Sequence, residues 1–271
     1  MTTGPRVCVV VPTRDAERTL ERCLASVRAQ TYRNVELIVV DNHSGDTTRE
    51  IARRHADAVV VAGPERSAQR NRGWRMSGGE YVVFIDADMV LTDTVLADVV
   101  AAFRAEPGIG ALVLPELAFG QGFLAQCRAL EKRLYLGDGR VEAARAFPRR
   151  VLLDLGGYDE HLTAFEDWEL PDRVRAAGYG IGRVASLVLH DEGRVGLRRA
   201  FRKKRYYGRW LPRYRQAHSA APRPLGRPAL LAHPLLALRA PHHFAGLLLL
   251  KAFEWSGLAL GASEGRGRVR P

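Results

Sequence analysis

The stretch Val35-Glu-Leu-Ile-Val-Val40, followed directly by Asp41-Asn-His-Ser-Gly-Asp46, decides the fold of this chain. A short apolar run without polar alternation predicts a strand that is buried on both faces. Similar runs alternate with stretches of helical periodicity, and Asp46 or Thr47 is expected to cap the second helix. The other runs are Arg6–Pro12, Ala58–Val61 and Tyr81–Ile85, and the helical stretches are Ala16–Thr31, Asp46–His55 and Ser67–Ser77. This alternation predicts an α/β fold, with a single Rossmann-like, mostly parallel sheet flanked by helices.

Composition and charge divide the chain into two parts. Its 271 residues, 46% of them hydrophobic, suffice for one large α/β domain with an appendage and exclude a disordered chain. The net charge of +11 is uneven: residues 190–271 contain 17 Lys and Arg against 4 Asp and Glu, whereas residues 1–189 contain 24 against 26. We therefore expect a catalytic domain over residues 1–190 and a basic, aromatic and apolar helical extension over residues 191–271.

Cysteine usage and hydropathy predict a cytoplasmic protein. The three cysteines, Cys8, Cys23 and Cys127, are widely spaced and odd in number, which predicts buried, reduced thiols. The N-terminus lacks the long apolar region of a signal peptide. No run reaches about 18 uncharged apolar residues, the usual length of a spanning helix; the nearest, residues 228–262, is interrupted by three charges.

Acidic residues follow two of the predicted strands. Asp41 follows one, and Asp86-Ala-Asp88 follows the strand at Tyr81–Ile85. Ligands of open parallel sheets bind at the carboxyl ends of strands, so these side chains are expected to converge. Two carboxylates at positions i and i+2 suit Mg²⁺ or Mn²⁺, which also take phosphate oxygens and water. The alternative for each aspartate is a helix cap or a turn former.

Five motifs in one order resemble family 2 glycosyltransferases with a GT-A fold. The resemblance covers about residues 6–190 and implies a glycosyltransferase that uses a nucleotide-sugar donor. The motifs are Val9-Val-Val-Pro-Thr-Arg14, Val35–Asp46, Ala68-Gln-Arg-Asn-Arg-Gly73, Gly79–Asp88 with its Asp-x-Asp element, and Leu155-Gly-Gly-Tyr-Asp-Glu160 with Phe165-Glu-Asp-Trp-Glu-Leu170 beyond it.

The resemblance assigns the donor site residue by residue. Asp41 would pair with the base, typically the uracil of UDP, in a pocket lined by Pro12 and Thr13. Arg70 would hold the nucleotide, although a solvated helix face also explains it together with Gln69, Arg72 and Arg75. Asp86 would contact the ribose or a divalent metal, Mn²⁺ or Mg²⁺, and Asp88 would bind that metal. His190, expected at a strand end after the run Val184–Leu189, would complete the metal or diphosphate shell; the alternative is a structural histidine.

The same resemblance assigns the catalytic carboxylates. Glu166 and Asp167 match the acidic pair before the acceptor helix, with Asp167 as the general base of a single, inverting displacement. The alternative is that both cap a helix over Trp168–Ala177. Gly156 and Gly157 would allow a tight turn below the donor sugar.

The C-terminal third interleaves cations with aromatic side chains at Phe201–Arg215 and then becomes very apolar. A basic, aromatic collar beside short apolar segments predicts an interfacial helix pair, hence peripheral contact with the inner face of the membrane through residues 201–262. Packing on the body or in a homodimer is the alternative, and nucleic acid is not expected as a partner. The apolar segments are Pro228–Leu231, Pro234–Leu238 and Phe244–Trp255.

The acceptor hydroxyl is expected on a lipid-linked or small molecule. Two other functions compete: a non-catalytic, transferase-like scaffolding protein, and a nucleotidyltransferase. The second normally has a glycine-rich loop after the first strand, where this chain has Pro12-Thr-Arg-Asp15.

Overall fold

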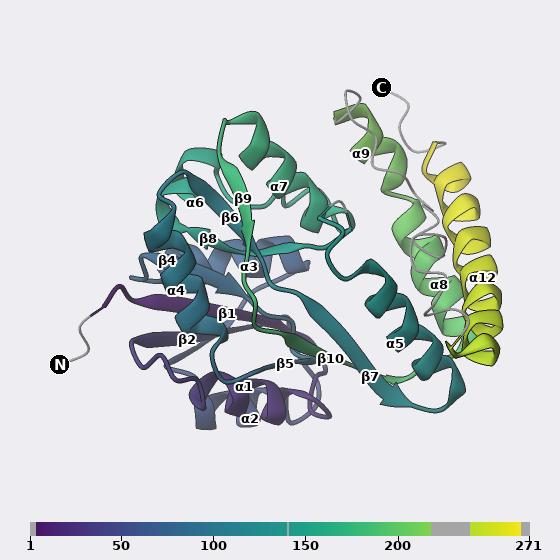
Figure 1. The fold of residues 1–271 in the computed structure, drawn as a ribbon, viewed down its shortest axis with the longest axis horizontal. Coiled ribbons are helices and arrows are strands. Elements are labelled where there is room, and N and C mark those ends of the chain that lie inside the picture. The colour runs from purple at the N-terminus through teal and green to yellow at the C-terminus, as the bar shows by residue number, and fades with distance from the viewer. Residues whose placement is uncertain (1–3, 140, 218–238, 267–271) are drawn as a thin grey trace. The chain divides into compact units, whose positions relative to one another are not determined.

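The buried run Val7–Thr13 forms β1, the strand around which a seven-stranded sheet is built in this computed structural model (Figure 1). The structure describes residues 4–139, 141–217 and 239–266. The sheet has the order β3-β2-β1-β4-β8-β6-β9, and β8 alone among these strands runs antiparallel to its neighbours. The other strands are β2 (Val35–Asp41), β3 (Ala58–Val61), β4 (Tyr81–Phe84), β6 (Ile109–Val113), β8 (Ala144–Pro148) and β9 (Gly180–Arg183). The predicted mostly parallel α/β sheet is therefore confirmed.

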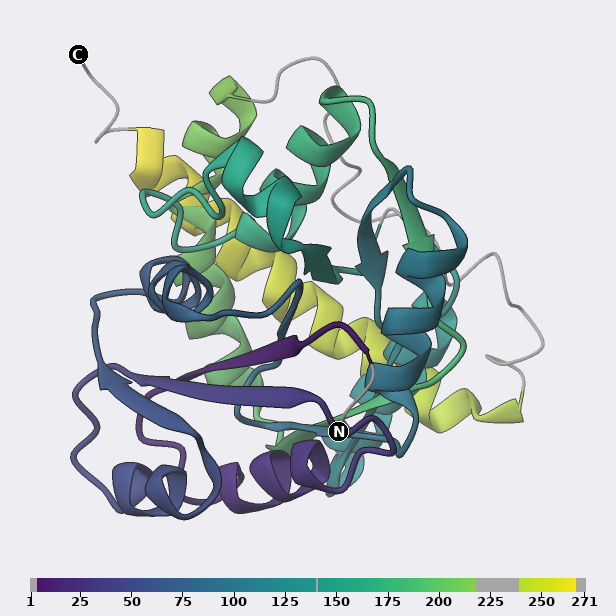
Figure 2. The same cartoon turned by 90° about the vertical axis from the view of Figure 1, so that its left-hand side faces the viewer.

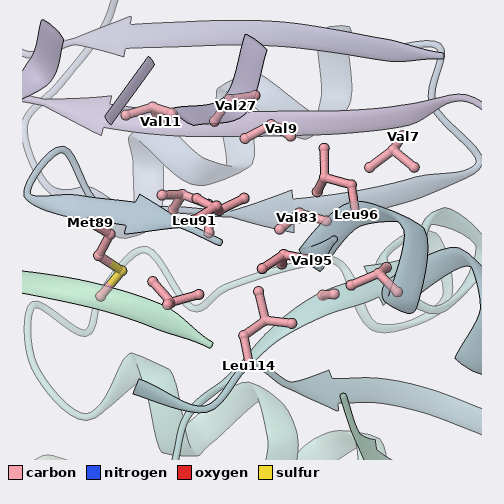
Figure 3. Packing of buried hydrophobic residues seen from close by; sticks show 14 of the residues in the cluster. Val7, Val9, Val11, Val27, Val83, Met89, Leu91, Val95, Leu96 and Leu114 are labelled. Atoms are coloured by element: carbon pink, nitrogen blue, oxygen red, sulfur yellow. The ribbon is translucent and has the colours of Figure 1, made fainter. Parts of the chain in front are cut away.

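Alternate residues of β1 point into two separate cores. Val7, Val9 and Val11 pack in the first core (Figure 3). Cys8 and Val10 pack in the second. Helices α1 and α2 lie on the opposite side of β1 and β2 from α3 (Figure 2). The first core takes side chains from α1 (Leu20–Arg28), α2 (Thr48–His55) and α4 (Val95–Ala105), and the second from α3 (Arg66–Met76), α6 (Arg149–Leu155) and α7 (Glu166–Ala176). Burial on both faces explains why these strands are continuously apolar.

The first helix is shorter than its periodicity predicts. The backbone N–H groups of residues 15, 16 and 17 donate to the side chains of Ser44, Thr48 and Asp46, in the loop after β2 and at the start of α2, so residues 15–17 are held as a loop. In that second loop, Thr47 occupies the N-cap position of α2, while the Asp46 carboxylate accepts the N–H of Thr48 at 3.0 Å. The two loops after β1 and β2 are thus fixed to each other before any ligand is considered.

A three-stranded sheet of order β5-β10-β7 adds the strand that carries His190. Its strands are β5 (Met89–Leu91), β10 (Val188–Arg194) and β7 (Glu116–Gln121). His190 pairs with Met89 in antiparallel register, one residue from Asp88. The expected place of His190, after a strand, is therefore wrong: it lies inside β10, and the apolar run before it is only partly a strand.

The chain divides into two compact units. The first contains residues 1–116, 142–161 and 166–190. The second contains residues 191–271, and also residues 117–141 and 162–165, which the sequence placed in the catalytic domain. All three cysteines are buried and unpaired, as predicted.

The second unit contains most of β7, the end of β10 and several helices, of which α12 (Pro241–Arg266) packs along α8 (Leu197–Gly208) (Figure 1). The other described helices of this unit are α5 (Phe123–Tyr135) and α9 (Leu211–Ala217). The expectation that no segment is long enough for a span is corrected: within the described residues, Pro241–Gly265 has the length and composition to cross a membrane. The apolar segments at 228–231 and 234–238 lie outside the described residues.

Candidate functional site

The ends of β1 and β2 place Thr13 opposite Asp41. The Thr13 hydroxyl donates to Asp41 Oδ1 at 3.1 Å, and the backbone N–H of Ser44 donates to Oδ2 at 2.9 Å. The Ser44 hydroxyl also donates to Oδ1. Asp41 is completely buried, and Pro12 beside it is buried too. The three donors therefore fix the orientation of the carboxylate.

Arg70 is the centre of the site and is completely buried on α3. Its Nη2 lies 2.9 Å from Asp86 Oδ1, and its Nη1 lies 2.8 Å from Asp167 Oδ1. The guanidinium also lies 5.1 Å from the centre of the Tyr158 ring. The interpretation of Arg70 as part of a solvated helix face is therefore wrong, whereas Arg72 on the same helix is exposed.

Gln69, next to Arg70, is also buried and ties the two strand ends together. Its side-chain amide donates to the carbonyl of Thr13 at 2.9 Å and to that of Val40 at 2.6 Å. The Ala68–Gly73 motif thus bonds to the strand ends through Gln69 and to the carboxylates of Asp86 and Asp167 through Arg70.

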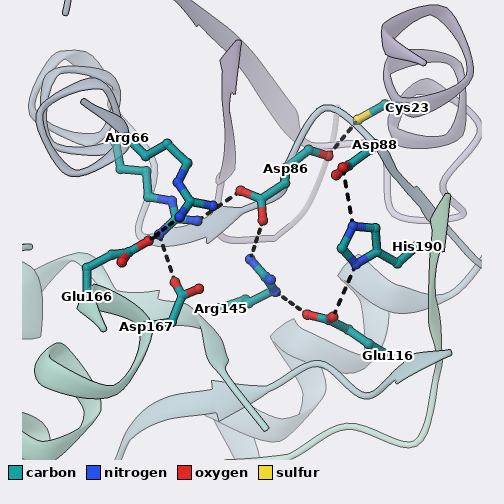
Figure 4. Close-up of polar contacts among 10 residues, drawn as sticks. Cys23, Arg66, Asp86, Asp88, Glu116, Arg145, Glu166, Asp167 and His190 are labelled. Carbon is teal, nitrogen blue, oxygen red and sulfur yellow. Dashed lines mark hydrogen bonds and ion pairs between the residues drawn. The ribbon is translucent and has the colours of Figure 1, made fainter. Parts of the chain in front are cut away.

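Asp86 is held between two arginines, one on each carboxylate oxygen. Arg145 Nη1 lies 3.3 Å from Oδ2, opposite the contact of Arg70 with Oδ1 (Figure 4). Burial raises the pKa of Asp86, but the charges of Arg145 and Arg70 outweigh burial and hold that pKa well below its usual range. Asp86 is therefore an ionised carboxylate whose oxygens are both engaged.

Asp88 and His190 meet on the far side of this motif. His190 Nε2 lies 3.2 Å from Asp88 Oδ2, and Nδ1 lies 3.7 Å from Glu116 Oε2. Burial lowers the pKa of His190, but the neighbouring carboxylates of Asp88 and Glu116 outweigh burial and raise that pKa to about 9. The pairing of β10 with β5, rather than the sequence, brings this imidazole to Asp88.

The sequence analysis missed Glu116 and Arg145, which close the network. Arg145 Nε donates to Glu116 Oε1 at 2.6 Å, so an alternating chain of charges runs from Asp88 to Asp86 (Figure 4). Two features of the sequence could have indicated these residues. Arg145 is the one charged residue in the apolar strand 144–148, and Glu116 follows soon after the apolar strand β6, much as Asp41 stands at the end of the apolar run of β2.

Asp88 and His190 supply an oxygen and a nitrogen donor that fit Mn²⁺, with room for phosphate and water ligands. Glu116 behind Nδ1 is the outer carboxylate that metal-binding histidines commonly face. Asp86 does not fit as well, because two guanidinium groups occupy it. Within the described ranges, no cluster of three or more His, Cys, Asp and Glu side chains forms a complete metal site.

Glu166 and Asp167 begin α7 and differ in exposure. The Glu166 side chain is 2% exposed, with Arg66 Nη2 3.1 Å from its Oε1, whereas the Asp167 side chain is 28% exposed. Burial, together with the negative charge of Asp167, raises the pKa of Glu166 to about 7 against the attraction of Arg66 and Arg70. Both residues lie in the first helical turn, but their carboxylates bond to arginines of α3, which a cap alone does not explain.

The turn that ends α6 requires glycine. Gly156 and Gly157 both have φ of +78°, which confirms the predicted turn. A Cβ at Gly157 would lie 2.4 Å from Asn71 Oδ1. That Asn71 oxygen accepts the backbone N–H of Tyr158 at 2.9 Å, which fixes the ring below Arg70.

Comparison with known proteins identifies a family for part of the chain. Residues 8–138 match the family model of glycosyl transferase family 2. The pre-mycofactocin glycosyltransferase of Mycobacterium tuberculosis is 28% identical over 97% of this chain. The chain spans 54% of that relative, and 14% and 16% of two longer curated relatives.

Solved structures share the fold. Mannosyltransferase PcManGT from Pyrobaculum calidifontis, in complex with GDP-Man and Mn²⁺, has a TM-score of 0.63 at 22% identity, covering 99% of this chain and 82% of that one. Glucosyl-3-phosphoglycerate synthase from Mycobacterium tuberculosis, in complex with Mn²⁺, UDP and phosphoglyceric acid, has a TM-score of 0.54 at 21% identity, covering 78% of each chain. Over residues 8–138 the chain therefore matches glycosyl transferase family 2, and its main sheet has the fold of the GT-A glycosyltransferases.

Proposed function

We propose that this protein is an inverting, metal-dependent glycosyltransferase that moves a sugar from a nucleoside diphosphate sugar, UDP-sugar in the first instance, to an acceptor hydroxyl. The observation that carries the proposal is the position of Arg70. One buried guanidinium holds both Asp86, at the donor end, and Asp167, at the acceptor end. Asp167 keeps a partly exposed carboxylate beside this junction, where a general base is needed.

The donor is held by the strand ends. Asp41 accepts the N–H of the base, Pro12 and Thr13 line the same pocket, and Asp86 contacts the ribose. Because Asp41 has no exposed surface, its role requires the Ser44 hydroxyl to turn away when the base enters. The base is not fixed by these residues, since one structural neighbour was solved with GDP-Man and another with UDP.

Asp88 and His190 would hold the divalent metal, Mn²⁺ or Mg²⁺. Asp86 would contribute less to it, because two guanidinium groups engage its carboxylate. When bound, the metal supplies positive charge to the departing diphosphate. His190 would give up its proton to bind it, so metal affinity should rise with pH. Both structural neighbours described above contain Mn²⁺, which supports the choice of ion.

Transfer is a single displacement. The acceptor oxygen forms its bond to the anomeric carbon as the bond from that carbon to the diphosphate oxygen breaks, and the nucleoside diphosphate leaves with the electron pair. Asp167 accepts the hydroxyl proton, which becomes acidic only as the new bond forms. Attack from the face opposite the leaving group inverts the anomeric centre. We propose that the acceptor is a hydroxyl group of a lipid-linked or small molecule and that transfer takes place in the cytoplasm. The buried free thiols support the cytoplasmic compartment.

The test is Asp167→Asn with Asp172→Asn as its control, because both residues lie on α7 and their side chains are similarly exposed, at 28% and 25%. Asp167→Asn should reduce sugar transfer by about 10²–10⁴-fold while nucleotide affinity by calorimetry stays within a few-fold. The control should retain activity. Unchanged transfer in Asp167→Asn would remove it as the base.

Donor identity requires a separate measurement. Calorimetric titration of the wild-type protein with UDP and with GDP, each with and without Mn²⁺, is expected to show tighter UDP binding when Mn²⁺ is present. If neither nucleotide binds under any condition, the donor site itself is wrongly assigned.

A further inference from the structure

The second unit presents an uncharged, mostly apolar face along one side of α12, on which Ser256 and Ser263 are also exposed. Its large exposed side chains are Leu248, Leu249, Phe253, Trp255 and Leu260, between 38% and 49% exposed. Their spacing places them on one side of the helix, together with the exposed alanines 245, 252 and 259. We define these eight residues as the outer face of α12.

The charges of α12 point away from the outer face. Lys251 Nζ lies 2.7 Å from Glu131 of α5 and 2.8 Å from Glu254, which also pairs with Arg128 of α5. These groups form a buried network of alternating sign. Because Lys251 and Glu254 lie near the middle of the helix, a membrane-spanning α12 would carry both charges to the bilayer centre, away from Arg128 and Glu131. That transfer is unfavourable, so α12 is better suited to lie on a membrane than to cross it.

Helix α8 supplies cations at a defined level along α12. The two helices pack closely in parallel register, because Gly257 of α12 lies against the carbonyl of Phe201, and Gly261 against that of Arg205. This register places the exposed side chains of Arg198 and Arg202 level with residues 254–258 of α12.

The acidic side chains of this region do not neutralise Arg198 and Arg202. Within residues 191–266, omitting the undescribed 218–238, there are four acidic side chains, and each is buried or ion-paired. Asp191 is buried, Glu192 lies 4.0 Å from Arg128, Glu254 is in the buried network, and Glu264 pairs with Arg205 and Arg209.

We propose that the outer face of α12 is a membrane-binding surface, which lies in the interface of an anionic lipid bilayer with Arg198 and Arg202 at the phosphate level. An uncharged apolar stripe flanked by cations has the two features that interfacial helices use: burial of apolar area and attraction to anionic headgroups. All of these residues belong to the second unit, and none of them takes part in the donor, metal or base sites assigned above.

Vesicle flotation of the full-length protein tests the proposal. Binding should be strong to phosphatidylglycerol-containing vesicles and weak to pure phosphatidylcholine. The double variant Leu249→Glu/Phe253→Glu should lower the partition coefficient at least ten-fold, whereas Leu153→Glu, at a 60% exposed leucine of α6, should leave it unchanged. Arg198→Ala and Arg202→Ala should each reduce the preference for anionic vesicles about five-fold, the equivalent of about 1 kcal/mol per cation.

A second readout locates the helix at the membrane without disturbing folding. Brominated lipids should quench tryptophan fluorescence in the wild-type protein, and Trp255→Phe should remove most of that quenching while the protein still binds. An alkaline carbonate wash should release the protein from vesicles. Three results would overturn the proposal: resistance to that wash, which indicates a spanning helix; equal binding by the double variant; or a dimer in sedimentation that the double variant dissociates, which assigns the face to a second copy.

Discussion

Replacing Arg70 by methionine removes the charge that three carboxylates share. Arg70 is completely buried, with Asp86 at 2.9 Å, Asp167 at 2.8 Å and Glu166 at 3.5 Å. Removing one partner of a buried ion pair costs about 3–5 kcal/mol. Here Arg145 still neutralises Asp86, and the 28% exposed Asp167 regains water. We therefore expect a loss near the lower end, about 3 kcal/mol, or a fall in Tm of about 6 °C or more.

The loss should depend on pH. Without the Arg70 charge, the pKa of Glu166, already about 7 in the folded protein, rises further above its unfolded value. A group with a raised folded pKa destabilises the protein increasingly as pH rises through that pKa. The penalty of Arg70→Met should therefore be larger at about pH 8 than at about pH 5.5.

The assay is urea unfolding followed by circular dichroism at both pH values. Arg72→Met is the matched control, because Arg72 lies on the same helix and is exposed; it should change stability by no more than about 0.5 kcal/mol. If Arg70→Met costs no more than the control, or costs the same at both pH values, then Arg70 does not hold these carboxylates together as argued.

Three further predictions concern other parts of the molecule. Gly157→Ala should lower the free energy of unfolding by about 2 kcal/mol or more, and Gly156→Ala by about 1 kcal/mol, measured as Tm shifts. Both residues have φ of +78°, but only at Gly157 would a Cβ meet neighbouring side chains. Equal Tm shifts in the two variants would contradict this. Glu166→Gln removes an ionisation that is unfavourable in the folded state, so its free energy of unfolding relative to wild type should increase as pH rises from about 4.5 to about 7; a flat difference in urea titrations would count against the raised pKa. Glu131→Gln should lower the free energy of unfolding by about 2–3 kcal/mol, since Lys251 loses one of its two buried partners. Amide hydrogen exchange should become faster in α5 and α12. Unchanged exchange in these helices would show that the network does not anchor α12.

The sequence determined the first four strands, the helices between them and most of the donor edge of the site. The runs at β1 to β4 are apolar on both faces, so local periodicity identified each strand within one or two residues. The carboxyl ends of parallel strands share one edge, so Asp41 and Asp86 were found without knowledge of the fold. Helix ends were less certain, because the N–H groups of residues 15–17 bond to a loop about 30 residues away.

Only the tertiary structure decided which charges meet. Arg70 has the same residue type and helical setting as Arg72, and burial by surrounding elements alone makes one of them the centre of the site. His190 reaches Asp88 through the pairing of β10 with β5, and Arg145 joins Asp86 to Glu116 across three elements. Lys251 and Glu254 interrupt an apolar run in the sequence, yet they face α5 and leave the opposite side of α12 uncharged. Periodicity reports the neighbours of a residue along one element, whereas ion pairs form between residues that only packing brings within a few ångströms.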